Sequence, residues 1–141
     1  MANIIPFAFR GELLSGTHNF ANGGNSFKIA LYTGNPYGTG STAYLTGQEV
    51  SANNTGYTTA GKVLAGQAVV STGAVATVDF TDSSLTNATF TAAFAAIYND
   101  TNADKLCVVL DFGGNKTATN GTFTISFPNP STPANAIISM A

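Results

Sequence analysis

Thr122-Phe123-Thr124-Ile125-Ser126-Phe127 carries the clearest pattern in this sequence, because polar and apolar side chains alternate along it without a break. Successive side chains of a β-strand point to opposite faces of a sheet, so the alternation predicts a strand with its three apolar side chains turned inward. Prolines follow at positions 128, 130 and 133. They predict the end of the strand, since proline has no N–H to donate to a neighbouring strand.

Short apolar runs of the same kind fill much of the remaining sequence, separated by Gly, Asn, Ser and Thr, which is typical of an all-β sandwich or barrel. We expect about eight strands, at residues 27–32, 62–70, 75–80, 88–91, 93–98, 106–112, 122–127 and 136–140, with a further short segment near 48–51. Turns are expected at 71–74, 99–104 and 113–121. The predicted fold class is therefore an antiparallel, jelly-roll-like β-sandwich.

Two segments depart from this short-strand pattern. Residues 7–15 carry apolar side chains at spacings of three and four, which predicts one short helix ending at Gly16. Residues 106–112 are apolar on nearly both faces, which predicts a strand in the middle of its sheet. We interpret the chain, 1–141, as a single β-sandwich domain with an N-terminal arm and helix at about 1–18 and a long loop at about 33–60.

The sequence is polar but carries few charged residues. Asp, Glu, Lys and Arg make up 9% of the chain, against about 25% in soluble domains, whereas 20 Thr, 10 Ser and 14 Asn fill most polar positions. The five basic residues are scattered, which argues against nucleic acid and anionic membranes as partners. The sequence shows no membrane-spanning run, no secretion signal and only one cysteine, Cys107, so we expect synthesis in a cytosol.

Two motifs resemble ligand sites but depart from the required pattern. Residues 56–62 have the spacing of a phosphate-binding loop, but Val63 stands where a magnesium-binding Ser or Thr belongs, and a β-run follows. Residues 100–104 resemble the start of a calcium loop with Asp111 at position twelve, but Lys105 replaces the required glycine. We therefore favour a glycine-pinned turn and a β-hairpin, and expect no metal and no cofactor.

Candidate catalytic residues are equally sparse. His18 is the only histidine and is expected to pack or cap near the helix, and Cys107 lies mid-strand in an apolar run, where a thiol behaves as a small hydrophobe. Asp79 and Asp82 are close enough in sequence to suggest paired glycosidase carboxylates, but two Asp beside a turn are more often turn formers. We therefore expect no enzymatic activity.

A family resemblance runs through most of the chain, in order and spacing. The segments that carry it are Glu12-Leu13-Leu14-Ser15-Gly16-Thr17-His18-Asn19-Phe20, Phe27-Lys28-Ile29-Ala30-Leu31-Tyr32-Thr33, Glu49-Val50, Gly56-Tyr57, Val78-Asp79-Phe80, Ile97-Tyr98-Asn99, Val109-Leu110-Asp111-Phe112-Gly113 and Ala136-Ile137-Ile138. Together they resemble structural proteins of tailed-bacteriophage virions. The resemblance implies a capsid decoration, or cement, protein on the outside of the head, made in the host cytoplasm. A tail- or fibre-associated module that binds the host is the alternative.

The resemblance also implies the major capsid protein as a partner, and the capsid symmetry suggests that the chain forms a dimer or trimer with itself. We expect the contacts to involve the N-terminal segment, with Phe7 and Phe9, and the long loop, with Tyr37, Tyr44 and Tyr57. Ordinary packing of the loop is an equal alternative for the tyrosines. Because few charges are available to protect strand edges, we also expect neighbouring subunits to cover those edges.

Overall fold

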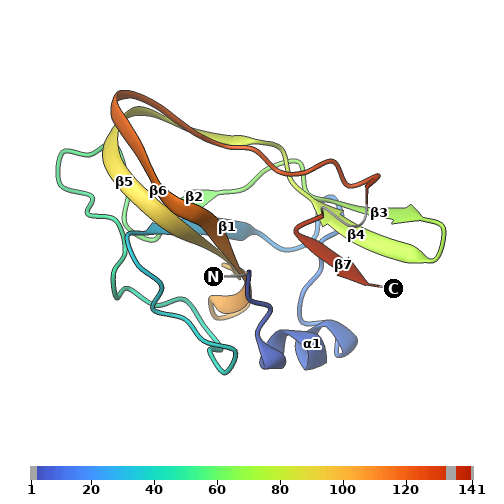
Figure 1. Ribbon diagram of the computed structural model, residues 1–141. Coiled ribbons are helices and arrows are strands. Elements are labelled where there is room, and N and C mark those ends of the chain that lie inside the picture. The colour runs from blue at the N-terminus through green and yellow to red at the C-terminus, as the bar shows by residue number, and fades with distance from the viewer. Residues whose placement is uncertain (1–2, 133–135, 141) are drawn as a thin grey trace.

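The computed structural model describes residues 3–132 and 136–140, which form two antiparallel sheets and one short helix (Figure 1). One sheet has the strand order β2-β1-β5-β6 and the other β3-β4-β7. The elements are α1 (Phe7–Leu14), β1 (Phe27–Tyr32), β2 (Lys62–Val63), β3 (Ala68–Thr72), β4 (Val75–Asp79), β5 (Ser83–Asn99), β6 (Lys105–Ile125) and β7 (Ile138–Met140). The predicted all-β, sandwich-like fold with one N-terminal helix is confirmed, with seven strands among the described residues instead of the expected eight or so. Met1, Ala2, residues 133–135 and Ala141 of the expected domain lie outside the described residues.

The helix and the first strand lie where the sequence predicted them. Pro6 stands at the N-cap of α1 with φ of −61°, which suits the start of a helix, and Gly16 follows its end with φ of +77°. Strand β1 matches the expected bounds, and the turn between β3 and β4 is the expected hairpin. Within the described residues, no helix is long and apolar enough to cross a membrane.

Strands β5 and β6 form one long bent hairpin where four shorter strands were expected (Figure 1). The predicted turn at 99–104 is confirmed, but the predicted turn at 113–121 is wrong, since β6 continues through it. Gly113 and Gly114 have positive φ values, and the register of β5 against β6 shifts between Ala92 and Phe94. The glycines therefore mark irregularities that bend a strand instead of ending it.

The bend divides this hairpin into two halves. We call residues 93–99 and 105–111 the proximal half, which lies beside β1, and residues 83–92 and 112–125 the distal half. In Figure 1 the distal half runs back along the top of the molecule toward β3 and β4. The same pair of strands thus contributes to two different parts of the fold.

The expected strand at 62–70 is also corrected, because β2 and β3 belong to different sheets. Gly66 lies between them with φ of +64°, and a Cβ atom there would come within 2.0 Å of the Thr81 hydroxyl oxygen. Only glycine fits this crossing without displacing a neighbour. The expected segment at 48–51 is not a strand, since Glu49 makes one isolated bridge with Tyr32. The last strand is shorter than expected, at Ile138–Met140.

Residues 106–112 are covered on both faces as expected, but their predicted place in the middle of a sheet is wrong. Strand β6 is the last strand of its sheet. Its outer edge is covered instead by isolated bridges, from Ile4 to Val109 and from Ala43 to Lys105. Both backbone hydrogen bonds between Ile4 and Val109 form, at 2.9 and 2.8 Å. The N-terminal arm and the long loop therefore replace a neighbouring strand.

The core has two parts, one on each side of β1 and the proximal half. The larger part lies between the sheets and contains an aromatic cluster in which Phe20 and Phe27 stack with ring centroids 4.3 Å apart. The smaller part lies on the other side, where Tyr32, Tyr98 and small alanines of β1 and β5 pack under the long loop. The loop at 33–60 therefore covers one face of the four-stranded sheet, and we call it the loop cover.

Candidate functional site

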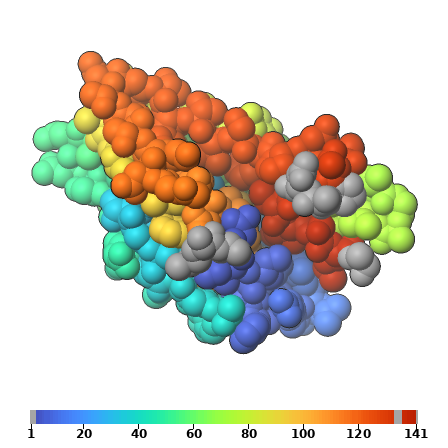
Figure 2. Space-filling view, viewed as in Figure 1, coloured from blue at the N-terminus to red at the C-terminus, as the bar shows by residue number. Residues whose placement is uncertain are grey.

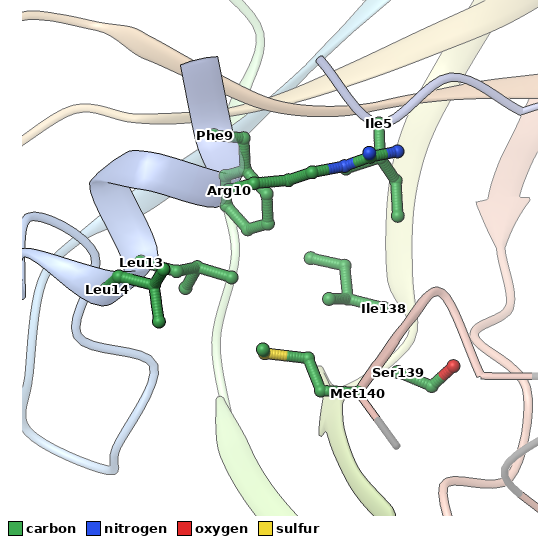
Figure 3. Close-up of a pocket in the computed structure, with 8 residues that line it drawn as sticks. All are labelled: Ile5, Phe9, Arg10, Leu13, Leu14, Ile138, Ser139 and Met140. Carbon is green, nitrogen blue, oxygen red and sulfur yellow. The ribbon is translucent and has the colours of Figure 1, made fainter. Parts of the chain in front are cut away.

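An apolar hollow lies on the surface between α1 and β7, with a volume of about 320 Å³ (Figure 3). Leu13 and Leu14 line it from the helix, and Ile138 and Met140 line it from the strand. In Figure 3 the end of the Met140 side chain points toward Leu13, and Arg10 extends toward Ile5. Among the described residues that line the hollow, Arg10 is the only charged one.

A second hollow, of about 240 Å³, adjoins the first and extends the apolar surface toward β3 and β4. The two share Leu13, Ile138 and Met140, and Val69 lines the second. Six large apolar side chains are exposed among the described residues, and three of them, at positions 14, 69 and 140, line these hollows. Scattered exposed apolar side chains are normal, whereas a gathered patch commonly marks a contact site.

The helix presents its exposed apolar side chains because its other face is fixed to the core. Phe9 is buried, with ring centroids 5.0 Å from His18 and 6.1 Å from Phe20. Phe7, Arg10 and Leu14 follow at helical spacing on the remaining face. Phe7 is 62% exposed and Leu14 is 85% exposed, and the Arg10 guanidinium lies 5.9 Å from the centre of the Phe7 ring. We call Phe7, Leu14, Val69 and Met140, with the two hollows, the α1–β7 surface.

The five interface residues predicted from the sequence occupy three different environments. Phe7 lies exposed on the α1–β7 surface, Phe9 and Tyr57 are buried in the larger part of the core, and Tyr37 and Tyr44 pack in the smaller part under the long loop. Tyr37 and Tyr57 are buried and Tyr44 is half-buried. Within the chain the tyrosines therefore serve the packing role that the sequence left open. Their contact with a neighbouring subunit stays a prediction.

Glu49 holds the loop cover together through its carboxylate. Tyr44 donates to one carboxylate oxygen at 2.5 Å, and Tyr57 and the Ala60 N–H donate to the other at 2.6 and 2.8 Å. Tyr57 in turn accepts from the Leu31 N–H of β1 at 3.1 Å. Burial, together with the neighbouring carboxylate, raises the pKa of both Tyr44 and Tyr57. The hydroxyl groups are therefore kept neutral, as donors that tie the loop to the sheet.

Three further tyrosines complete this network. The Tyr32 hydroxyl lies 2.6 Å from that of Tyr37 and donates to the Leu45 carbonyl oxygen at 2.7 Å. The Tyr98 hydroxyl donates to the Ala60 carbonyl oxygen. All five tyrosines of the chain therefore take part in fixing the loop, and burial raises the pKa of Tyr32, Tyr37 and Tyr98 as well. The arrangement is a structural clamp.

His18 and Cys107 lie close together in the interior. The Cys107 sulfur is 3.7 Å from His18 Nδ1, and His18 Nε2 is 2.7 Å from a Glu12 carboxylate oxygen. Asn99 donates to the same Nδ1 at 3.0 Å, so the partners assign the neutral tautomer with its proton on Nε2. Cys107 is buried, and burial followed by the negative charge of Glu12 raises the pKa of its thiol. A neutral, buried thiol is a packing group, as the sequence predicted.

Glu12 connects this buried network to the surface. Its carboxylate also accepts from Lys105 Nζ at 3.1 Å. Burial raises the pKa of Glu12, but the hydrogen bonds from His18 and Lys105 outweigh that effect and leave its pKa lowered. The network thereby joins the end of α1 to the start of β6, and the predicted packing role of His18 is confirmed.

The motifs that resembled ligand sites have structural roles. The residues of the phosphate-loop pattern form turns that lead directly into β2, and Lys62 donates to the Ser84 carbonyl oxygen. The residues of the calcium-loop pattern form the turn between β5 and β6, where Asp100 pairs with Lys28 at 3.3 Å. Asp82 accepts from the Phe127 N–H at 2.8 Å, and Asp79 ends β4. In the described part of the chain, no group of three or more His, Cys, Asp or Glu side chains is placed so that it could hold a metal ion.

Phe7 was predicted from the sequence as a contact residue, whereas Leu14, Val69 and Met140 were not. One signal for Leu14 was available, because the spacing that turns Phe9 and Leu13 inward turns Phe7 and Leu14 outward. Val69 and Met140 join the surface only through tertiary packing.

Comparison of the chain with models of protein families, with curated proteins and with solved structures found no match.

Proposed function

We propose that this chain is a non-enzymatic structural protein of a tailed-bacteriophage virion, a decoration protein that binds the outside of the head and joins neighbouring subunits of the major capsid protein. The observation that carries the proposal is the α1–β7 surface, an exposed apolar patch in which Arg10 is the one charged residue among the described residues of its larger hollow. A patch of this kind is suited to a partner that excludes water from it. The family resemblance of the sequence supplies the identity of that partner.

The composition supports the same proposal. A decoration protein must tolerate many copies of itself at close spacing, and a chain with 9% charged residues and a net charge of −2 repels its neighbours little. Its Thr, Ser and Asn side chains offer hydrogen bonds across interfaces without the desolvation cost of a charge. The loop cover and the buried His18 network give the single chain a stable interior of its own.

Binding to capsids tests the proposal. Purified chain is mixed with expanded capsids prepared without it, and bound protein is measured by co-sedimentation, with capsid stability followed by heating. We expect saturable binding and greater heat resistance. Leu14→Asp or Met140→Asp is expected to weaken binding tenfold or more, because burying each apolar side chain contributes about 1.5–3 kcal/mol and a buried carboxylate opposes binding.

Val63→Asp is the matched control. Val63 is 53% exposed and Met140 is 52% exposed, but Val63 lies on β2, away from the α1–β7 surface. It should bind capsids like the unchanged chain. Equal loss in all three variants, or no binding by the unchanged chain, contradicts the proposal. Labelling of intact virions with an antibody against the chain then distinguishes a position on the head from one on the tail. Signal at the tail tip would favour the tail-associated alternative.

A further inference from the structure

The outer edge of β6 changes character at the bend. In the proximal half, Ile4 and Ala43 bridge to that edge. From Gly113 to Ile125, no described strand or isolated bridge lies on the outer side of β6. Figure 1 shows this segment running along the top of the molecule, and in Figure 2 its atoms lie at the surface on the face in view. An uncovered strand edge presents a row of backbone N–H and C=O groups ready to pair with another strand.

This edge has little protection against such pairing. Lys116 is the only charged residue between Phe112 and Phe127, and the first proline is Pro128. The other outer strands are much shorter, with two residues in β2, five in β3 and three in β7. The edge of distal β6 is therefore the longest one available for a partner.

The sequence along this edge has two-fold symmetry in its pattern of side chains. It reads Thr117-Ala118-Thr119-Asn120-Gly121-Thr122-Phe123-Thr124, so the order of hydroxyl and apolar side chains is the same in both directions. The four threonines are exposed, whereas Ala118 and Phe123 are buried toward the core. The irregular step, where Asn120 has φ of +49°, lies at the centre of the pattern.

We propose that two copies of this chain pair through these edges, antiparallel about a two-fold axis between Asn120 and Gly121. In this register Thr117 lies opposite Thr124 of the second copy, and Thr119 lies opposite Thr122. Residues directly opposite in an antiparallel pair point to the same face, so hydroxyl meets hydroxyl on the outer face. On the inner face, the small Ala118 lies opposite the large Phe123.

The geometry of the inner face favours this register. A hollow of about 380 Å³ lies along the edge and is lined by both Ala118 and Phe123. A second strand laid against the edge would close this hollow, with its own Ala118 beside Phe123. Lys116 lies outside the eight-residue palindrome at one end, so the lysines of the two copies stand at opposite ends of the pair and repel each other little. A two-fold contact also closes on itself, because the distal edge of β6 in each copy is occupied by that of the other copy.

Sedimentation of the free chain tests this inference independently of capsid binding. We expect a concentration-dependent dimer. The double variant T119K/T122K places like charges opposite each other twice across the axis. It should raise the dissociation constant of the dimer tenfold or more. T119E/T122E should do the same. Mixing the two variants in equal amounts should restore dimers, because every cross-axis pair then joins opposite charges.

Circular dichroism and thermal melting of each variant check that the monomer stays folded. Thr86→Lys is the control, because Thr86 is exposed on the inner strand β5 of the same hairpin and does not lie on the open edge. It should leave the dimer unchanged. A chain that stays monomeric at high concentration overturns the inference. So do folded variants that dimerise as readily as the unchanged chain, or that fail to recover dimers on mixing.

Discussion

The proximal and distal halves of the β5–β6 hairpin use the same two strands in opposite ways. In the proximal half, both faces are buried, by the main core on one side and by the loop cover on the other. In the distal half, Phe90 and Phe123 face the core while threonines face outward. The outer edge is bridged in the first case and open in the second.

The difference follows from the side chains that each half carries. Residues 106–110 are apolar at successive positions, so neither face can remain in water and the chain must supply a second cover. Residues 117–124 alternate, so one face is satisfied by water and needs no cover from the same chain. One continuous strand can therefore serve as the interior of a monomer at one end and as a contact surface at the other.

Alkaline pH should unfold the chain through its effect on the proximal half, and this is the largest expected effect on stability. All five tyrosines of the chain contact its cover, and the pKa of each is raised above the ordinary value of 10.0, chiefly by burial. Their contribution is complete below pH 10 and is lost as the pH rises above it. Each buried tyrosine that must stay neutral lowers the stability by about 1.4 kcal/mol per pH unit.

The measurement is a parallel titration of tyrosinate absorbance and circular dichroism. Both signals should change together, at a pH above 10, because the buried tyrosines ionise only when the chain unfolds. Tyrosines that titrate near pH 10 while the circular dichroism stays native would show that the loop cover opens without unfolding.

Substitutions on the outer face of each half should give very unequal losses of stability. Leu106 is 1% exposed under the loop cover, and Leu106→Ala is expected to lower the free energy of unfolding by about 2–5 kcal/mol. Thr122 is exposed on the distal outer face, and Thr122→Ala should change it by less than about 0.5 kcal/mol. Denaturant unfolding of both variants, at concentrations where the chain is monomeric, measures the contrast. Similar losses in the two variants would remove the distinction between the halves.

The loop cover itself depends on one carboxylate. Glu49→Gln keeps the shape but replaces a charged acceptor of three hydrogen bonds with an amide, and should lower the free energy of unfolding by about 1.5–3 kcal/mol. Compared with the unchanged chain, this variant should show faster hydrogen exchange in the loop at 33–60, with a smaller change in the distal half. Asp82→Asn is the control, because the structure records a single exposed hydrogen bond, from the Phe127 N–H, at its carboxylate. Equal effects of the two substitutions would contradict the role given to Glu49.

The parts of the fold that local patterns specify were predictable. The alternation in β1 and in residues 122–127, the apolar run at 106–112 and the helix at 7–15 all have a single local interpretation, and each forms the expected type of element. Two of the errors concern glycines. Gly66 separates two strands that were expected to be one, whereas Gly113 and Gly114 lie inside a strand that was expected to end. A glycine permits either outcome, and only the packing around it decides.

The candidate sites were less predictable for a related reason. An aromatic side chain in a long loop suits an interface or a core equally well. Tyr44 and Tyr57 are fixed within the chain by hydrogen bonds to Glu49, and Tyr37 by hydrogen bonds with Tyr32 and the Leu45 N–H, which no local pattern contains. The α1–β7 surface assembles residues from three distant segments, around positions 14, 69 and 140. The palindrome at 117–124 was visible in the sequence, but it gains meaning only once β6 is known to be an outer strand.

The smallest expected effect concerns the threonine pairs of the distal face. The Thr91 and Thr117 hydroxyl oxygens are 2.8 Å apart across β5 and β6, in a pair that water can reach. Replacing either by Val keeps the shape and the β-propensity, so each loss should be about 0.2–1 kcal/mol, with a coupling in the double variant below about 0.5 kcal/mol. A double-mutant cycle on Thr91 and Thr117, measured once with the monomer and once with the dimer, shows whether the second copy contacts this pair. In the proposed dimer, Thr117 also faces Thr124 of the second copy. Thr117→Val should therefore lower the free energy of unfolding more in the dimer than in the monomer, whereas Thr91→Val should lower it equally in both. A cost that is identical in both states for Thr117 would place the contact between copies elsewhere on the molecule.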